Sequence, residues 1–192
     1  MNTLKVEKRN MQTKAKKLRR EGFVTGNVFG KEIKGSIPIQ ITKKNAEELL
    51  KTSRKGSQVM MNLDGSDMDV LIKEINYDSM KHQIIEMDFQ QLVKGEMVHS
   101  VAEVILLNHD KVTEGIVELD LHEIAYKATP DALVEKIEID LGTLRIGDEI
   151  KVKDLAIASD KKVSLQTNPE ESVVRIVEAH ADVEDAEETE AE

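Results

Sequence analysis

The chain has 192 residues, and none of them is a cysteine or a tryptophan. Without thiols the protein cannot form a disulfide framework, a thiolate metal site or a cysteine nucleophile. The same absence is compatible with a reducing cytosol. Redox chemistry at cysteine is therefore excluded from the functions open to this protein.

Aromatic residues are also scarce, at 3% of the chain. The core is therefore expected to be aliphatic, built from the Ile, Val, Leu and Met residues found in almost every segment. This composition fits a β-rich scaffold better than an aromatic-lined ligand pocket.

Long apolar runs are a third absence. No stretch approaches the length needed to cross a bilayer, and the first residues, MNTLKVEKRN, carry charges where a signal peptide needs an apolar run. We therefore expect a soluble, cytoplasmic protein with no membrane partner.

Charge is distributed very unevenly along the chain. The net charge is -10, yet residues 1–57 hold 15 Lys and Arg against 5 Glu, a balance of 15 - 5 = +10. The remainder therefore carries -10 - 10 = -20. Residues 178–192 contribute eight acidic side chains and no Lys or Arg, which predicts a disordered acidic tail.

The N-terminal half alternates short strands with two short helices. The pattern predicts strands at TLKVEK, FVTGNVFG, SIPIQIT, VMMNL, MDVLIKEI and QIIEMDFQQL. A mostly charged helix is expected around Leu18, ending at Gly22. A second helix is expected after Thr42, an N-cap candidate, and should end near Lys55–Gly56. Asp64–Gly65 is a hairpin-type turn pair, which Ser66–Asp67 could lengthen.

The C-terminal half is a succession of short strands from about residue 96, punctuated by Pro130, Gly142 and Gly147. We expect a mainly β protein with short helices. Its predicted parts are a basic domain at 1–92, a β-rich domain at 93–178 and an acidic tail at 179–192.

Three features of the sequence suggest a phosphate-binding loop, a metal site or a catalytic site, and we accept none of them. The segment from Gly26 to Glu32 resembles a phosphate-binding loop, but it has three residues between its glycines and Glu after the Lys, so we interpret it as a turn. The five histidines lack metal-ligand spacing, and we assign no metal and no cofactor. Glu86 and Asp88 share one face of a predicted strand, where carboxylates are usually only solvated, and we expect no enzymatic activity.

The strongest local signal is the basic stretch from Lys8 to Arg20, with seven Lys and Arg and no acid. Binding to a phosphate backbone needs this concentration of charge, and arginine can bind phosphate through two hydrogen bonds. A solvated helix face explains the same composition equally well.

The order of the segments favours nucleic-acid binding. KRN…KKLRREGFVTGNVFG, SIPIQI, DVLIKEINYD and IIEMDFQQL follow one another as in the N-terminal domain of bacterial large-subunit ribosomal protein L25, which they resemble. TPDALVEKIEIDLGTLRIGDEIKVKDL is similar to the second β domain of the long form of that family, the Ctc general stress proteins.

The resemblance implies a β-barrel domain that binds 5S rRNA in the large ribosomal subunit and a β-rich domain that faces other ribosomal elements, neighbouring proteins among them. Arg9 and Arg20 match the family's RNA-contacting arginines, and Asp88 matches its acidic contact. On electrostatic grounds we add Lys14, Lys17 and Arg19 as supporting phosphate contacts.

Three residues depart from the family pattern at this expected RNA face. Phe29 stands in place of Tyr, Asn76 in place of Gln, and Glu86 in place of His. The first loses a hydroxyl, the second has a shorter reach, and the third places an anion near phosphates.

Two hypotheses therefore remain. In the first, the chain is a ribosomal protein that binds 5S rRNA and tolerates these changes. In the second, it is a diverged stress-associated paralogue with weak or no 5S rRNA binding, which acts as a protein- or RNA-interaction module.

Overall fold

The computed structural model describes residues 3–112 and 115–178. The acidic tail predicted at 179–192 lies outside these residues. Within them, neither α-helix nor any 3-10 turn has the length and apolar character of a membrane span.

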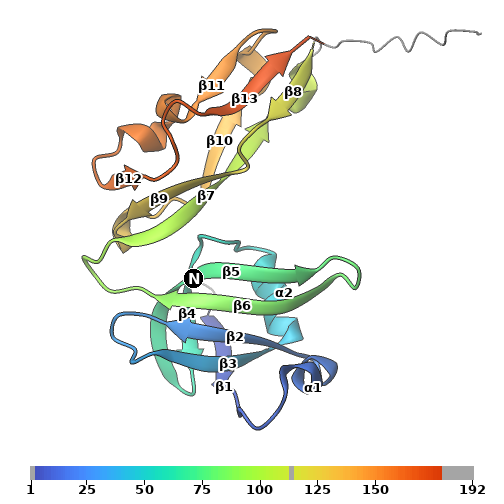
Figure 1. The fold of residues 1–192 in the computed structure, drawn as a ribbon, viewed down its shortest axis with the longest axis vertical. Coiled ribbons are helices and arrows are strands. Elements are labelled where there is room, and N and C mark those ends of the chain that lie inside the picture. The colour runs from blue at the N-terminus through green and yellow to red at the C-terminus, as the bar shows by residue number, and fades with distance from the viewer. Residues whose placement is uncertain (1–2, 113–114, 179–192) are drawn as a thin grey trace, which may run out of the picture.

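The N-terminal part is a closed barrel with the strand order β1-β3-β2-β6-β5-β4 (Figure 1). Its strands are β1 (Thr3–Lys8), β2 (Phe23–Phe29), β3 (Ser36–Thr42), β4 (Gln58–Leu63), β5 (Ser66–Asp78) and β6 (Gln83–Gln91). The pairs β1–β4 and β2–β6 are parallel, and the other neighbours are antiparallel. The predicted barrel is confirmed.

Alternate residues of each strand point into the barrel, as the two-residue period predicts. Val24 and Val28 of β2 pack there with Met87 and Phe89 of β6. The core is aliphatic except for Phe89, so the expectation of a purely aliphatic interior was wrong at this position.

Two short helices accompany the barrel. In α2 (Lys43–Leu50), the Thr42 hydroxyl accepts a hydrogen bond from the Asn45 amide, and Ala46 and Leu49 are buried in the barrel core. This helix stops at Leu50, earlier than predicted, because the next residues offer no apolar side chain to bury. The charged helix α1 (Ala15–Arg20) forms where predicted and buries only Leu18.

Glycine is needed at two places in the barrel, a close contact between strands and a hairpin turn. A Cβ atom at Gly26 would lie 1.9 Å from the Met87 carbonyl oxygen, so glycine allows β2 to approach β6. The predicted turn at this segment was therefore wrong up to Phe29, which still belongs to β2. Asp64 and Gly65 both have positive φ in a two-residue hairpin turn, and β5 begins directly at Ser66.

The C-terminal part consists of two small sheets, ordered β10-β7-β9-β12 and β11-β13-β8 (Figure 1). The strands are β7 (Val98–Leu107), β8 (Ile116–Leu119), β9 (Glu123–Ala128), β10 (Lys136–Asp140), β11 (Glu149–Lys151), β12 (Val163–Leu165) and β13 (Ser172–Val177). Between them are the 3-10 turns η1 (His109–Lys111), η2 (Pro130–Ala132), η3 (Leu141–Thr143), η4 (Val152–Asp154) and η5 (Ala156–Ser159).

The core of this part also has one aromatic residue, Tyr126, which is fully buried. Its hydroxyl donates a hydrogen bond to the Val134 carbonyl at 2.8 Å and accepts one from the Val134 amide at 2.7 Å. Burial is the largest cause that raises the pKa of Tyr126.

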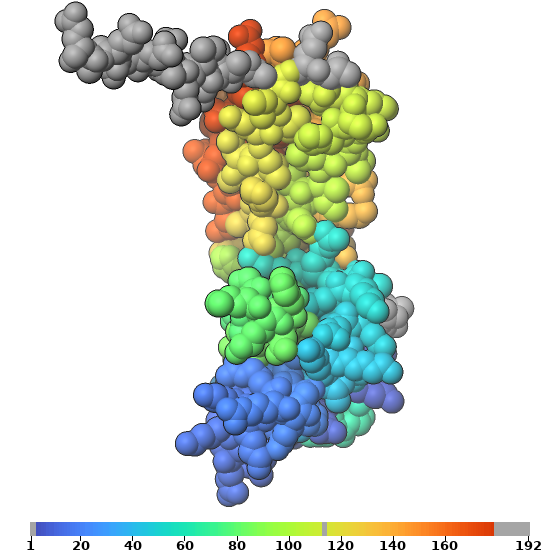
Figure 2. Space-filling view, turned by 90° about the vertical axis from the view of Figure 1, so that its right-hand side faces the viewer, coloured from blue at the N-terminus to red at the C-terminus, as the bar shows by residue number. Residues whose placement is uncertain are grey.

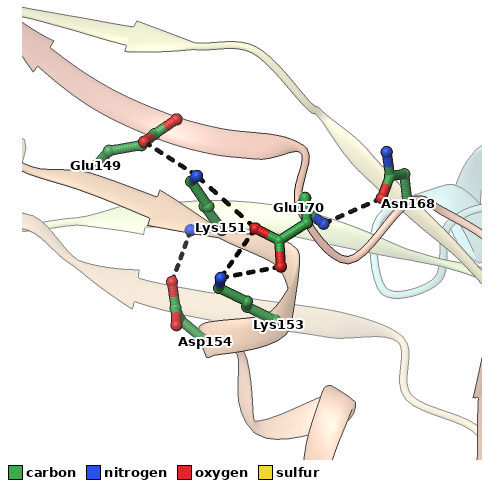
Figure 3. A network of polar contacts seen from close by, with 6 residues as sticks. All are labelled: Glu149, Lys151, Lys153, Asp154, Asn168 and Glu170. Atoms are coloured by element: carbon green, nitrogen blue, oxygen red, sulfur yellow. Dashed lines mark hydrogen bonds and ion pairs between the residues drawn. The ribbon is translucent and has the colours of Figure 1, made fainter.

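The segment EIKVKDL, which belongs to the predicted succession of short strands, is interrupted after Lys151. The Asp154 carboxylate accepts a hydrogen bond from the Lys151 amide at 3.0 Å, which favours the turn η4 over further strand (Figure 3). The ammonium group of Lys153 binds Glu170 at 2.9 Å, and that of Lys151 lies between Glu149 and Glu170. These ion pairs join the turn to the loop before β13, and hydrogen bonding and charge from Lys153 lower the pKa of Glu170.

Barrel and C-terminal sheets meet through an apolar patch formed by Leu71, Leu92, Val98 and Leu133. Three cations of the barrel also bind groups of the C-terminal part. Arg54 binds Glu103, Lys55 binds Glu123 at 2.6 Å, and the Lys73 ammonium donates to the His99 carbonyl at 2.7 Å. Burial and the neighbouring Lys55 lower the pKa of Lys73. Three barrel cations are thus used within the protein.

We expect Gly56→Ala to loosen this junction. Gly56 has a φ of +86°, and a Cβ atom there would lie 2.2 Å from the Val101 carbonyl oxygen across the junction. The matched control is Gly65→Ala, which has the same left-handed strain (φ +92°) but open space around its Cβ. The control should lose about 1–2 kcal/mol of unfolding free energy, and Gly56→Ala clearly more.

The measurement is chemical denaturation of both variants, together with their radius of gyration by small-angle scattering. Equal losses in the two variants and an unchanged radius would contradict a tight junction at Gly56.

Candidate nucleic-acid interface

Helix α1 presents its cations to solvent because only Leu18 of the helix packs inward. Lys14, Lys16, Lys17, Arg19 and Arg20 are all exposed. Lys17 forms an ion pair with Glu21, with Nζ and Oε1 3.7 Å apart. Lys16, Arg19 and Arg20 form no ion pair with any other residue that the structure describes, so they remain available to an external anion.

A cleft of about 570 Å³ lies between α1 and the hairpin that joins β5 to β6. We call it the basic cleft, because its lining contains one carboxylate, Asp78, and five cations: Lys16, Arg19, Arg20, Lys43 and Lys81. Two of these cations are ion-paired, Lys43 with Glu47 and Lys81 with Asp78. Lys43 and Lys81 did not feature among the sequence predictions. They lie outside the basic stretch from Lys8 to Arg20, and only the fold brings them to α1. Lys14 and Lys17, which were predicted as phosphate contacts, are not in this lining.

The basic cleft lies at one end of the molecule. In Figure 2 the blue surface that contains α1 forms the end opposite the C-terminal sheets. A large anionic partner can therefore approach the cleft without contacting the acidic C-terminal part.

Arg9 follows β1 and belongs to the outer surface of the barrel. Its amide donates to the Pro38 carbonyl, and its guanidinium donates to the Thr13 carbonyl at 3.1 Å. The Nε atom is buried and has no hydrogen-bond partner among the described residues. A buried donor without a partner is costly, and a rearrangement of the Arg9 side chain toward the oxygen of a bound ligand would relieve this cost.

Strand register brings the other predicted residues onto one outer face, formed by β5, β6 and β2. Asn76 lies opposite Glu86, Asp88 lies opposite both Glu74 and Asn27, and Phe29 lies opposite Gln90. Directly paired residues point to the same side of a sheet, so these side chains are neighbours. We call this set the strand face.

The strand face is rich in carboxylates, since Glu74, Glu86 and Asp88 occupy neighbouring positions on β5 and β6. The basic cleft begins where this face ends, at Gln83–Ile85 of β6 and Phe23–Val24 of β2. Phe29 is at the other end of β2, about 20 Å from Phe23 at the usual rise of a strand. The predicted residues therefore form a cationic group and a separate acidic face.

Asp88 has an internal role that the sequence did not show. Its Oδ1 atom accepts hydrogen bonds from the Asn27 amide at 2.9 Å and from the Asn27 side chain at 3.2 Å. Because Asn27 and Asp88 lie on the parallel strands β2 and β6, these bonds help to close the barrel.

We therefore expect the variants Asp88→Asn and Asp88→Ala to differ in their free energy of unfolding. The Asn27 amide keeps an acceptor in Asp88→Asn but loses it in Asp88→Ala, which should cost about 1–3 kcal/mol of unfolding free energy. Thermal and urea denaturation measure this difference. Equal stability of the two variants would show that the bonds to Asn27 contribute nothing, and Glu74→Ala on the same face is the control.

Fold and surface together define a two-part β protein with a cationic end suited to a polyanion. Comparison with known proteins gives the family. Residues 4–89 match the Ribosomal L25p family, and residues 97–180 match the family described as ribosomal protein TL5, C-terminal domain. The chain belongs to the ribosomal L25p family, in its longer form, as the resemblance implied.

Relatives cover nearly the whole chain. The large ribosomal subunit protein bL25 of Enterococcus faecalis is 32% identical over 91% of this chain and 86% of its own length. The protein of the same name from Caldanaerobacter subterraneus is 34% identical over 91% of this chain and 88% of its own. That of Listeria monocytogenes is 27% identical over 95% and 88%.

Proposed function

We propose that the chain is a structural component of the large ribosomal subunit that binds 5S rRNA through the basic cleft and Arg9. The observation that carries the proposal is the gathering of five cations from α1, α2 and the β5–β6 hairpin in one cleft. Family membership supports the ribosomal assignment, since the relatives are named as large-subunit proteins.

The physical properties of the cleft suit folded RNA. Phosphates along an RNA backbone are regularly spaced anions, and their neutralisation by Lys and Arg releases counterions. The wide minor groove of A-form RNA lets a protein recognise shape and 2′-hydroxyl groups, for which the outer face of a barrel is suitable. No catalytic step is needed for this function.

A specific observation favours the second hypothesis, the stress-associated paralogue with weak or no 5S rRNA binding. The strand face places Glu86 beside Asn76 and next to the pair formed by Glu74 and Asp88. Three carboxylates close together repel a phosphate backbone. In this alternative, the β domains act as an interaction module for another RNA or for a protein.

We expect the double variant Arg9→Ala/Arg20→Ala to lose most of its affinity for 5S rRNA. Charge-assisted hydrogen bonds are worth about 1.5–3 kcal/mol each, so the affinity should fall by about a hundredfold or more. The slope of log affinity against log salt should also become shallower, by about 0.7–0.9 for each phosphate that the variant no longer neutralises.

The measurement is a titration of 5S rRNA with the full chain at several salt concentrations. Arg145→Ala/Lys162→Ala is the matched control, since it removes two exposed cations from the C-terminal part. Wild-type protein that shows no salt-dependent binding, or a double variant that binds as well as the control, would refute the proposal.

The variant Glu86→His separates the two hypotheses. If the chain binds 5S rRNA through its cations, we expect the affinity to change by less than about fivefold, because an exposed charge interaction contributes about 1 kcal/mol or less. If the strand face has become repulsive, the same change should strengthen binding markedly. The measurement is the same titration, with Glu135→His, outside the strand face, as the control for an equal change of charge.

A further inference from the structure

The outer edge of β10 borders a groove in the C-terminal part. Strand β10 is the last strand of its sheet, and within residues 3–112 and 115–178 it pairs only with β7. The groove has a volume of about 550 Å³ and lies between β10 and the segment that contains η4 and η5.

Backbone groups of β10 point into this groove. The Glu135 carbonyl accepts a hydrogen bond from the Glu103 amide, and the parallel register pairs Lys136 with Glu103. In a parallel ladder, alternate residues bond to the same neighbour, so Ile137 and Ile139 bond to β7. The amide and carbonyl groups of Lys136, Glu138 and Asp140 therefore point away from β7 and are available to another strand.

The floor of the groove is apolar. Its lining includes Ile137, Ile139, Leu144, Ile150, Leu155 and Ile157. Several of these belong to the core of the C-terminal part, so the floor is firmly held. An open sheet edge beside an apolar groove is the geometry with which proteins bind extended peptides.

The rim of the groove is acidic. Its charged residues are Glu138, Asp140, Asp154, Asp160 and Lys136, a balance of 1 - 4 = -3. Hydrogen bonds from Asn108 and Gly142 lower the pKa of Asp140. Such a rim repels phosphates and attracts Lys and Arg, so the charge favours a basic protein segment over RNA.

We propose that this groove binds an extended basic segment of another protein, which adds a strand to the sheet beside β10. The bound segment alternates apolar side chains, which enter the groove, with Lys or Arg side chains, which meet the acidic rim. Its backbone bonds to Lys136, Glu138 and Asp140. This site is independent of the RNA-binding proposal, because it uses no residue of the barrel.

The test uses the full chain labelled with ¹⁵N and a peptide of about eight residues, a usual strand length, that alternates valine and lysine. The matched control peptide has glutamate in place of lysine. We expect the lysine peptide to shift the amide resonances of Lys136, Glu138 and Asp140, and to bind at least about tenfold more tightly than the glutamate peptide.

Two protein variants make the test specific. Glu138→Pro removes an amide that points into the groove and leaves the ladder with β7 intact, so it should fold and lose most of the binding. Glu138→Lys keeps the amide and reverses the charge, and it should weaken binding by about tenfold. Asp131→Lys, an exposed acid outside the groove, is the control and should bind normally.

The proposal is overturned if the lysine peptide shifts none of these amides, or if the glutamate peptide binds equally well. Shifts of these same amide resonances on addition of 5S rRNA without the peptide would assign the groove to RNA instead. If the protein self-associates in sedimentation and the peptide can then no longer bind beside β10, the groove would be assigned to a second copy of the chain. The variant Arg9→Ala/Arg20→Ala should bind the peptide normally. The outcome of the peptide test therefore does not depend on whether the RNA-binding proposal is correct.

Discussion

The close approach of β2 to β6 at Gly26 is the constraint on which the rest of the barrel depends. These two strands are parallel, so they come from segments about sixty residues apart and no turn holds them together. Only a residue without Cβ fits against the Met87 carbonyl. Next to this contact, the Asp88 carboxylate accepts hydrogen bonds from the backbone amide and from the side chain of Asn27 on the opposite strand. This contact closes the barrel and aligns the strand face.

The same closure decides where the charges lie. Helix α1 contacts β2, and the β5–β6 hairpin extends beside it, so the basic cleft exists only because β2 and β6 are neighbours. Lys43 reaches the cleft because α2 follows β3 directly. A cluster of cations is electrostatically unfavourable in an isolated protein, and carboxylates offset only part of it here, by pairing with Lys43 and Lys81. The fold can hold it because hydrophobic burial and the strand ladders, rather than the surface, supply the stability.

Local features of the sequence predicted most of the fold. Strands such as β1 and β4 alternate apolar and polar residues, the Asp64–Gly65 turn has its own signature, and both helices have clear spacing. Non-local features could not be predicted in this way. The pairing of Asn76 with Glu86 depends on irregularities of register in β5 and β6, which no local pattern encodes. The turn η4 depends in part on Glu170, a residue distant in sequence.

The total charge of a stretch of sequence does not show where its cations lie in the structure or which of them are already paired. The balance of +10 for residues 1–57 treats all the cations as equal, but Arg54 and Lys55 bind carboxylates of the C-terminal part at the junction. In return, the basic cleft gains Lys81 from outside this stretch. Because Coulomb interactions with a phosphate backbone decay within about 10 Å in salt, the local arrangement matters more than the total charge. A chain with a net charge of -10 can therefore present one cationic end to RNA and an acidic groove to a basic protein segment.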